Sequence, residues 1–155
     1  MVAISTAAEA DLQELLPLMR GYCDFYSVDP SDAGLLAMSR ALIADPEHEG
    51  FQLIARDDAG RAIGFATVFW TWSTSSASRI GVMNDLFVHP DARGDGAADE
   101  LIAECATRAR AHGATSLEWQ TAQDNHRAQK VYDRVGGQRD DRWLSYRIDL
   151  MERRR

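Results

Sequence analysis

The residues whose types and spacing most clearly suggest chemistry lie just after a predicted strand that ends at Pro90. They form a short turn, residues 93–98, that reads Arg93, Gly94, Asp95, Gly96, Ala97 and Ala98. Glycines remove side chains where the backbone turns, so bare N–H groups can face a ligand. A long helix is predicted to begin in this turn, and a helix start adds unpaired N–H donors and a partial positive charge. The pattern indicates an anion site suited to a phosphate or pyrophosphate.

Neither of the common nucleotide-binding loops fits this turn. The GK[ST] ending of a P-loop is absent, and the third glycine of the GxGxxG fingerprint is missing after Gly96. From the residues of the turn alone, a glycine-rich strand-to-helix connection without a ligand therefore stays as open as an anion site.

Two further segments extend the pattern. Residues 85–90 read Asp-Leu-Phe-Val-His-Pro, and a predicted helix over residues 125–135 carries Asn125, Ala128, Val131 and Tyr132, with Gly136 after it. Together with the turn, which matches (Q/R)xxGx(G/A), these segments resemble the GNAT family of N-acetyltransferases, whose signatures include D-L-x-V-x-P and N-x-x-A-x-x-[LV]-Y-x-x-x-G. The resemblance covers nearly the whole chain. It implies acetyl-CoA as donor, a primary amine as acceptor and a homodimer.

The resemblance also assigns residues to the donor. Backbone N–H groups of residues 86–88 should hold the thioester carbonyl and the pantetheine arm, in the manner of an oxyanion site. The turn should cradle the pyrophosphate through its main chain, while Asn125 and Ala128 line the pantetheine and adenine side. The implied donor-binding residues are Leu86, Phe87, Val88, Arg93, Gly94, Asp95, Gly96, Ala97, Ala98, Asn125 and Ala128. Two positions depart from the family pattern: Asp95 is acidic beside the expected pyrophosphate, and Gly137 replaces a common aromatic residue.

Acetyl transfer to an amine needs two proton-handling groups. An amine is mostly protonated near pH 7 and must lose a proton before it attacks, and the leaving thiolate must gain one. By the resemblance, Tyr132 is the candidate thiolate donor, with packing against the donor as the alternative. Asp85 is the first choice for binding the acceptor ammonium and removing its proton, with a strand-edge salt bridge as the alternative. Glu118, on the adjoining predicted strand, is the reserve base, unless it simply faces solvent.

The acceptor wall should be aromatic. Tyr22, Phe25 and Tyr26 recur at helical spacing, and the run Tyr-Cys-Asp-Phe-Tyr resembles the Y-x-x-F-Y of a subgroup that acetylates small amines such as polyamines or lysine analogues. Trp70 and Trp72 alternate, which places both on one face of their predicted strand. Aromatic faces suit a cationic ligand, although a core aromatic cluster fits the same residues. Residues 1–90 hold 5 basic and 12 acidic residues, which favours a cationic partner or plain solubility.

The elements that must position these residues form one α/β domain. The chain has 155 residues, of which 45% are hydrophobic, and this is enough for a single core over residues 1–150, followed by a charged tail at 151–155. Hydrophobic periodicity predicts the order β-α-α-β-β-β-α-β-α-β, a mixed, mostly antiparallel sheet flanked by helices. In this interpretation Gly21 ends the first helix and the third helix covers residues 94–112. The last two strands cover residues 116–121 and 142–150.

Composition excludes several classes of protein. The longest apolar run, residues 64–70, is strand-sized, so we expect no membrane span, and without a secretory pattern we expect a cytoplasmic protein. The chain has only two cysteines, Cys23 and Cys105, and this count excludes a disulfide scaffold. The four histidines show no metal-ligand spacing, and a formal net charge of -7 argues against nucleic acid.

We therefore expect an acetyl-CoA-dependent N-acetyltransferase that acts on a small cationic amine by direct transfer in a ternary complex. Two alternatives stay open. A protein lysine or N-terminal acetyltransferase would need an open acidic groove, and a non-catalytic acyl-CoA-binding module would bind the donor without turnover.

Overall fold

A computed structural model describes residues 1–151 of the chain. Its sheet has the strand order β1-β2-β3-β4-β5 within those residues. The strands are β1 (Ala3–Thr6), β2 (Gly50–Arg56), β3 (Ala62–Ser73), β4 (Ser78–Val88) and β5 (Leu117–Glu118). Neighbours are antiparallel from β1 to β4, and β5 runs parallel to β4. The predicted fold class, a mixed and mostly antiparallel sheet flanked by helices, is confirmed.

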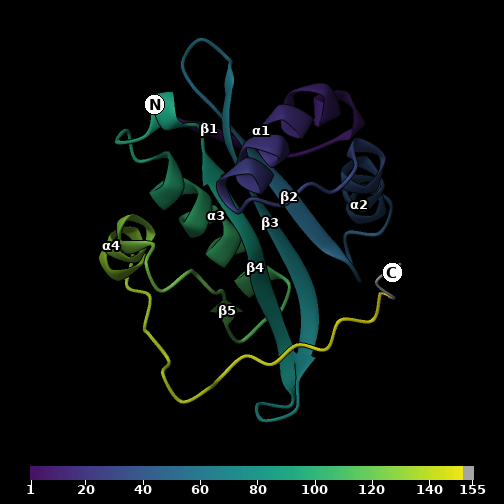
Figure 1. Cartoon of the computed structure of the whole chain (residues 1–155), viewed down its shortest axis with the longest axis vertical. Helices are drawn as coiled ribbons and strands as arrows, with labels where there is room; N and C mark the ends of the chain where they lie inside the picture. The colour runs from purple at the N-terminus through teal and green to yellow at the C-terminus, as the bar shows by residue number, and fades with distance from the viewer. Residues whose placement is uncertain (152–155) are drawn as a thin grey trace.

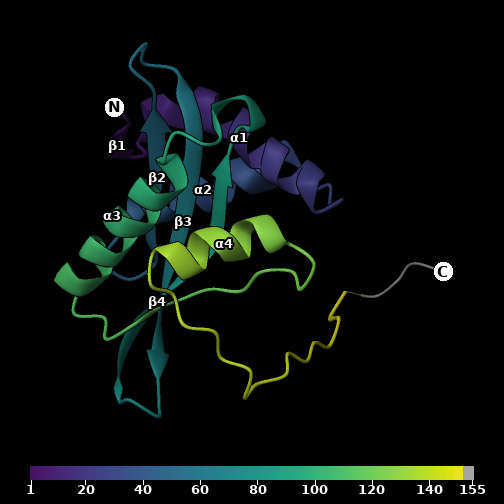
Figure 2. The same ribbon diagram turned by 90° about the vertical axis from the view of Figure 1, so that its left-hand side faces the viewer.

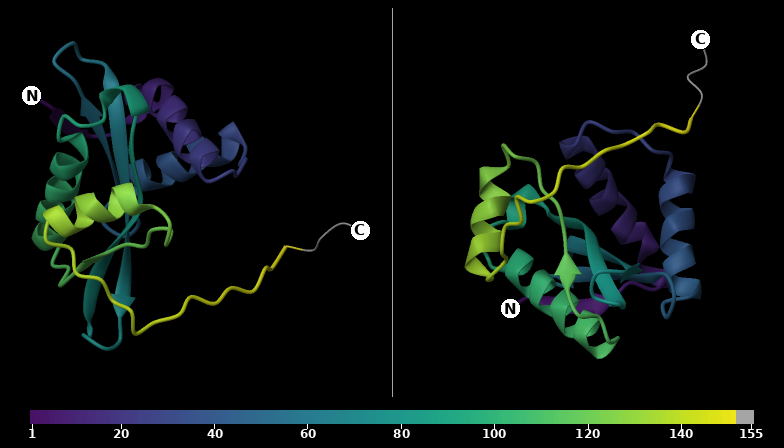
Figure 3. Two further views of the ribbon diagram at one scale, coloured as in Figure 1. Left: turned by 60° about the vertical axis from the view of Figure 1, so that its left-hand side comes forward. Right: turned by 90° about the horizontal axis from the view of Figure 1, so that it is seen from below.

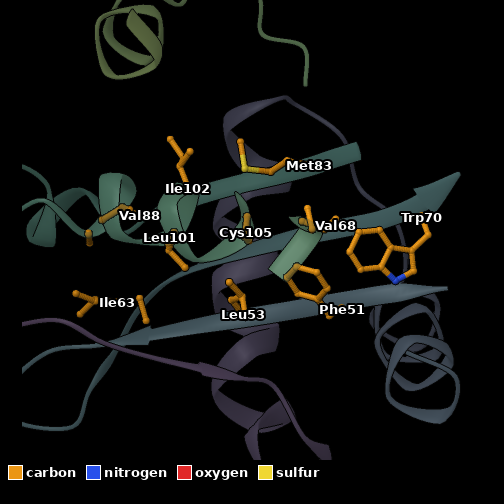
Figure 4. Packing of buried hydrophobic residues seen from close by; sticks show 14 residues of the cluster. Phe51, Leu53, Ile63, Val68, Trp70, Met83, Val88, Leu101, Ile102 and Cys105 are labelled. Carbon is orange, nitrogen blue, oxygen red and sulfur yellow. The ribbon is translucent and has the colours of Figure 1, made fainter. Parts of the chain in front are cut away.

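Helices cover both faces of the sheet (Figures 1 and 2). Helices α1 (Leu12–Phe25) and α2 (Asp32–Ala44) lie on one face, and α3 (Ala97–Ala111) and α4 (His126–Arg134) lie on the other. Short 3-10 helices, η1 (Glu9–Asp11) and η2 (Pro90–Ala92), lead into α1 and towards α3. Each face has its own apolar core, and Figure 4 shows the one beneath α3, where Leu101, Ile102 and Cys105 meet the sheet.

A β-bulge in the middle of β4 decides which side chains reach which face. Thr67 of β3 pairs with Asp85, but the next residue, Val68, pairs with Met83, so Asn84 is the extra residue. Met83 and Asp85 would share a face in a regular strand. The bulge instead sends Met83 into the core beneath α3, while Asp85 meets Tyr22 of α1. Bulges re-aim side chains in this way next to active sites.

Helix α1 does not end at Gly21 as predicted. It continues through this glycine to Phe25, because the position is used for close packing. A Cβ added at Gly21 would lie 2.7 Å from Cζ of Phe87 on β4. The glycine therefore lets the Phe87 ring approach the helix backbone, and the last turn of α1 carries its aromatic side chains over the end of β4.

The predicted strand over residues 142–150 is wrong. These residues are extended in the structure, but they lie apart from the sheet and their apolar side chains are exposed (Figure 3). The alternation is that of a strand, but within the described chain no strand lies beside it to accept its hydrogen bonds. Of the predicted tail, Met151 is exposed, and residues 152–155 lie outside the described part of the chain.

Candidate active site

The site lies where β4 and β5 part. Their pairing covers only Gly81 with Leu117 and Val82 with Glu118. Beyond it lies a pocket of about 490 Å³, lined by residues of α1, β4, α3 and α4 and of the turns before α3 and α4. The His89 N–H donates to the Ile63 carbonyl on the β3 side. Because backbone groups alternate in direction along a strand, the N–H groups of Leu86 and Val88 face the opening.

The glycine turn forms one end of the pocket. Gly94 and Gly96 both have positive φ, +95° and +82°, and a Cβ added at either would meet nothing within 4 Å. Gly94, Gly96, Ala97 and Ala98 line the pocket, so the first N–H groups of α3 are available there. Asp95 is exposed and is not among the lining residues. The acidic side chain therefore does not line the cavity in front of the glycine turn.

Arg93 lines the same pocket, but its side chain is already used. Its Nε donates to the Val88 carbonyl at 2.9 Å, and the guanidinium lies 5.9 Å from the centre of the Phe87 ring. Burial and the neighbouring Arg127 lower the pKa of Arg93. The side chain therefore holds the turn against the end of β4, which fixes the position of the glycine backbone.

Helix α4 forms the opposite wall. Asn125 caps it, with its side-chain oxygen accepting from the Ala128 N–H at 3.2 Å, and both residues line the pocket. Tyr132 lies one helical turn later, with its ring centre 5.4 Å from that of Trp119. Burial raises the pKa of the Tyr132 phenol, so the hydroxyl stays protonated at neutral pH and can donate a proton.

Asp85 lies behind the pocket wall at the bulge. It is 7% exposed, and its neighbours Tyr22 and Leu86 line the pocket. Burial raises the pKa of Asp85, while the polar groups of Thr67, Tyr22 and Asn84 beside it oppose that change. The Asn84 amide donates to the carboxylate at 3.0 Å, and the Tyr22 hydroxyl donates to the Asn84 carbonyl at 3.3 Å. Tyr22 has its pKa raised in turn, by burial and then by the Asp85 charge. A buried carboxyl with a raised pKa is a better proton acceptor than a free one.

The last turn of α1 brings an aromatic cluster to the pocket. The ring centres of Tyr22 and Tyr26 are 4.9 Å apart, and those of Phe25 and Tyr26 are 5.0 Å apart. Phe25 and Tyr26 are 55% and 40% exposed, so both rings are accessible from solvent. All three residues line the pocket together with Tyr132, so the aromatic cluster and the glycine turn face one cavity, and the role of the cluster as an acceptor wall stays a prediction.

Comparison with known proteins identifies the family. The model of the acetyltransferase (GNAT) family matches residues 15–137. The chain belongs to this family. The chain is 33% identical over 147 residues to an uncharacterised N-acetyltransferase, YhfO, of Bacillus subtilis, covering 95% of this chain and 97% of that protein. It is 31% identical over 115 residues to a D-amino-acid N-acetyltransferase of Saccharomyces cerevisiae, covering 74% of this chain and 70% of the relative.

A solved structure shows the same architecture. The protein AAC(6')-Iy, in complex with the bisubstrate analogue CoA-S-monomethyl-acetylneamine, superposes with a TM-score of 0.81 at 25% identity. The match covers 96% of this chain and 99% of that one. The GNAT resemblance seen in the sequence is therefore confirmed and the protein is an acetyltransferase, whereas the small-amine subgroup stays a prediction.

Three residues predicted for the acceptor site of this acetyltransferase lie elsewhere. Trp70 faces the α3 side, where its ring stacks on His112 at 4.0 Å and its Nε1–H donates to the Pro46 carbonyl at 2.9 Å. Trp72 shares that face and is 67% exposed near the β3–β4 turn. Glu118 is exposed and accepts from the Ser116 hydroxyl at 3.0 Å. The aromatic wall lies on the opposite face, over Asp85, so these three residues have no support as acceptor-site residues.

The sequence analysis missed a basic stripe on α4. Arg127, Lys130 and Arg134 also line the pocket. Arg134 is paired with Asp99 of α3, at 2.7 and 3.0 Å. The signal was present, because residues spaced by three and four lie on one face of a helix. The net charge of the chain, -7, indicates a cationic partner and gives no sign of a basic stripe on this helix.

Proposed function

We propose that this acetyltransferase moves an acetyl group from acetyl-CoA to the primary amine of a small cationic molecule, by direct transfer in a ternary complex. One observation carries the proposal. A single pocket of about 490 Å³ is lined by the glycine turn, the start of α3, Tyr132 and the aromatic end of α1. Anion-binding and cation-binding groups therefore face the same cavity.

The donor end of the pocket suits a nucleotide with a thioester arm. Open space at Gly94 and Gly96 lets phosphate oxygens approach the first N–H groups of α3. Arg127 and Lys130 add positive charge at the same wall. When bound, acetyl-CoA would supply an activated thioester carbonyl, and the N–H groups of Leu86 and Val88 are available to hold its oxygen as charge develops.

The protein's own residues then handle two protons. Asp85, whose pKa is raised by burial, accepts a proton from the acceptor ammonium, directly or through water, so that the neutral amine attacks the carbonyl carbon. The carbon–nitrogen bond forms, the carbon–sulfur bond breaks, and Tyr132 donates its phenol proton to the departing thiolate. The nitrogen then loses its second proton, which passes through water to the phenolate of Tyr132, and Asp85 releases its own proton to solvent, so both groups return to their starting states. The products are the acetylated amine and CoA.

The acceptor end of the pocket favours a cation. Tyr22, Phe25 and Tyr26 offer ring faces, which attract cations, and Asp85 lies beneath Tyr22 with its negative charge.

A homodimer in the cytoplasm belongs to the same proposal. Cys23 and Cys105 are both free and buried, which suits a reducing compartment. Among the described helices, none is long and apolar enough to cross a membrane.

The test is thiol release from acetyl-CoA with a panel of acceptors. The panel holds polyamines, lysine analogues, aminoglycosides, arylalkylamines, D-amino acids and a peptide with a free N-terminus and a lysine. We expect release with a small cationic amine and none with the peptide. Release with the peptide alone would favour a protein acetyltransferase, and binding of acetyl-CoA without release on the whole panel would favour a non-catalytic module.

A further inference from the structure

A row of buried polar side chains crosses strands β2, β3 and β4 on the face that α1 covers (Figure 1). In the strand pairing, Gln52 of β2 lies opposite Thr67 of β3, and Thr67 lies opposite Asp85 of β4. Side chains of residues directly opposite each other project from the same face of a sheet. The exposed fractions of Gln52, Thr67 and Asp85 are 3%, 0% and 7%, so this polar row is shielded from solvent along its whole length.

Apolar side chains surround the polar row. Ile54, Phe65 and Phe87 each lie two residues along a strand from one of its members, and all three belong to the apolar cluster beneath α1. A polar side chain buried among apolar ones costs free energy of folding unless its hydrogen bonds are made. Apolar residues at positions 52 and 67 would avoid that cost, so the stability of the sheet gives no reason for Gln52 and Thr67. The charge at the end of the row does give one, because a buried carboxylate needs donors around it.

The contacts of Gln52 fix the direction of the Thr67 hydroxyl. The Gln52 Nε2 donates to Thr67 Oγ1 at 3.1 Å and to Met19 Sδ at 3.6 Å. An amide nitrogen only donates, so the Thr67 oxygen is the acceptor in this contact and its own O–H is left for another partner. On the other side of Thr67 lies the Asp85 carboxyl. Burial raises the pKa of that carboxyl, and the polar group of Thr67 beside it lowers this pKa.

We propose that Gln52 and Thr67 are positioning residues for Asp85. Gln52 turns the Thr67 hydroxyl towards the carboxylate, and the hydroxyl holds the carboxylate where it can take a proton from the acceptor ammonium. The Asn84 amide donates to Oδ1 of Asp85 at 3.0 Å, so donors from two strands keep the carboxylate in one orientation. This inference rests on the proposed role of Asp85 as proton acceptor, and it extends the site to two residues that do not line the pocket.

Two titratable side chains of α1 also lie close enough to respond to the Asp85 charge. Burial raises the pKa of both Tyr22 and Cys23, and the charge of Asp85 acts in the same direction. Both side chains therefore stay neutral at neutral pH. Thr67 and Asn84, which approach the carboxyl from β3 and β4, do not titrate. A change in pH dependence at this place therefore reports on Asp85.

The experiment measures acetyl transfer to the amine that releases most thiol on the acceptor panel. Thr67→Val replaces the hydroxyl by a methyl group, whereas Thr67→Ser keeps the hydroxyl. With Thr67→Val the rising limb of kcat/KM should move to higher pH, because the lost hydroxyl favours the charged carboxylate. On that limb kcat/KM should fall about 3–10-fold, while the Kd of acetyl-CoA stays the same. Thr67→Ser should return both the limb and the rate to those of the native protein.

Gln52→Met and Ser39→Ala complete the set of variants. Gln52→Met should move the limb in the same direction by a smaller amount, and it should add nothing to Thr67→Val, because Gln52 acts through Thr67. Ser39→Ala is the matched control. Ser39 is buried on α2 and its hydroxyl donates to the same Met19 sulfur at 3.7 Å, so the change removes a buried polar group outside the row. Its pH limb should stay in place.

Carbon-13 NMR of the Asp85 carboxyl tests the contact without turnover. The carboxyl pKa should be higher in Thr67→Val than in the native protein and should return in Thr67→Ser. An unchanged carboxyl pKa in Thr67→Val would overturn the proposal, as would a slower reaction whose pH limb stays in place, because Thr67 would then act through packing alone. A higher carboxyl pKa with an unchanged rate profile, or with no amine acetylated, would support the contacts of the row and overturn the proposed role of Asp85 instead.

Discussion

At the scale of single residues, the most specific prediction concerns the phenol of Tyr132. Its hydroxyl is the proton donor that we propose for the thiolate, and burial keeps it protonated. Tyr132→Phe removes the hydroxyl and keeps the ring that packs on Trp119. We expect kcat to fall by about 10²–10⁴-fold, while the Kd of acetyl-CoA, measured by calorimetry, changes by less than about threefold. Full activity at neutral pH would remove Tyr132 from this role.

The proposed role of Asp85 predicts how the rate of acetyl transfer depends on pH. Burial raises the pKa of this carboxyl in the folded state, and the reaction needs the charged form. With the native protein, kcat/KM should therefore rise with pH through this elevated pKa. In Asp85→Asn the rate should fall about 10²–10⁴-fold and that rising limb should disappear.

The matched control for Asp85 is Glu118→Gln, a change of the exposed carboxyl outside the pocket. Its pH profile should superpose on that of the native protein.

The raised pKa of Asp85 also determines how the free energy of unfolding changes with pH. Because the folded pKa is above the unfolded one, the folded state loses stability as pH rises from the unfolded pKa through the folded one. Asp85→Asn should therefore gain stability relative to the native protein between those values in urea titrations. A pH-independent difference would contradict the assignment.

At the scale of elements, α3 offers a comparison between its two ends. Gly96 precedes it and Gly113 follows it, both have positive φ, and a Cβ at either meets nothing within 4 Å. Gly96→Ala and Gly113→Ala should therefore cost a similar stability, about 1–2 kcal/mol each. Only Gly96 lines the pocket, so only Gly96→Ala should weaken acetyl-CoA binding, by about tenfold or more. Equal affinities by calorimetry would contradict an anion site at this turn.

The packing of α1 on β4 predicts a second effect at this scale. An alanine Cβ at position 21 would lie 2.7 Å from the Phe87 ring, so the helix or the ring must move. Gly21→Ala should cost about 1–3 kcal/mol by overpacking, despite the better helix propensity of alanine, and should raise the KM for the amine by displacing Tyr22 and Phe25.

Phe87→Leu combined with Gly21→Ala provides the test of the cause. The smaller side chain removes the clash, so the double variant should lose less stability than the sum of the two single variants. Chemical denaturation of all four proteins measures this coupling. Additive losses would show that position 21 acts through something other than the Phe87 contact.

The elements were predictable where local signals and packing agree. The hydrophobic periodicity of β3, β4 and α3 gave each element at the right place, with α3 beginning at Ala97 rather than at 94. The residue pattern alone does not predict the bulge at Asn84, because the bulge appears only in the pairing of β3 with β4. The predicted helix end at Gly21 was wrong for a similar reason. A glycine inside a helix that allows close packing cannot be distinguished in the sequence from a glycine that ends a helix.

The same limit applies to the residues around the pocket. The glycine turn, Asn125 and Tyr132 could be named in advance because their spacing matches family signatures. Trp70 and Trp72 could not be placed, because alternation shows that two side chains share a face but not which face. Arg127 and Lys130 were visible as a stripe, yet only the fold shows that this stripe meets α3 at one pocket. Residues 142–150 are a further case, because their alternation is that of a strand although no strand lies beside them in the described chain.

At the scale of the whole molecule, the pocket lies between elements that are otherwise weakly joined. Helix α4 has no fully buried residue along its described length, whereas α3 contributes several to the core. A ligand that contacts both helices should therefore stabilise α4 more than the rest. CoA at about 100 times its Kd should add about 2.7 kcal/mol, which raises Tm by roughly 5–10 °C for a chain of this size. Hydrogen exchange should show the largest gain of protection in α4.

Pantetheine is the control ligand for this last prediction, because it carries the thiol arm of CoA without the phosphates. If the start of α3, Arg127 and Lys130 hold phosphate groups, pantetheine at the same concentration should raise Tm much less than CoA, and raised salt should weaken only the CoA effect. Equal shifts for the two ligands would mean that the thiol arm alone is bound. Protection by CoA that spares α4 would mean that the ligand does not join the two helices.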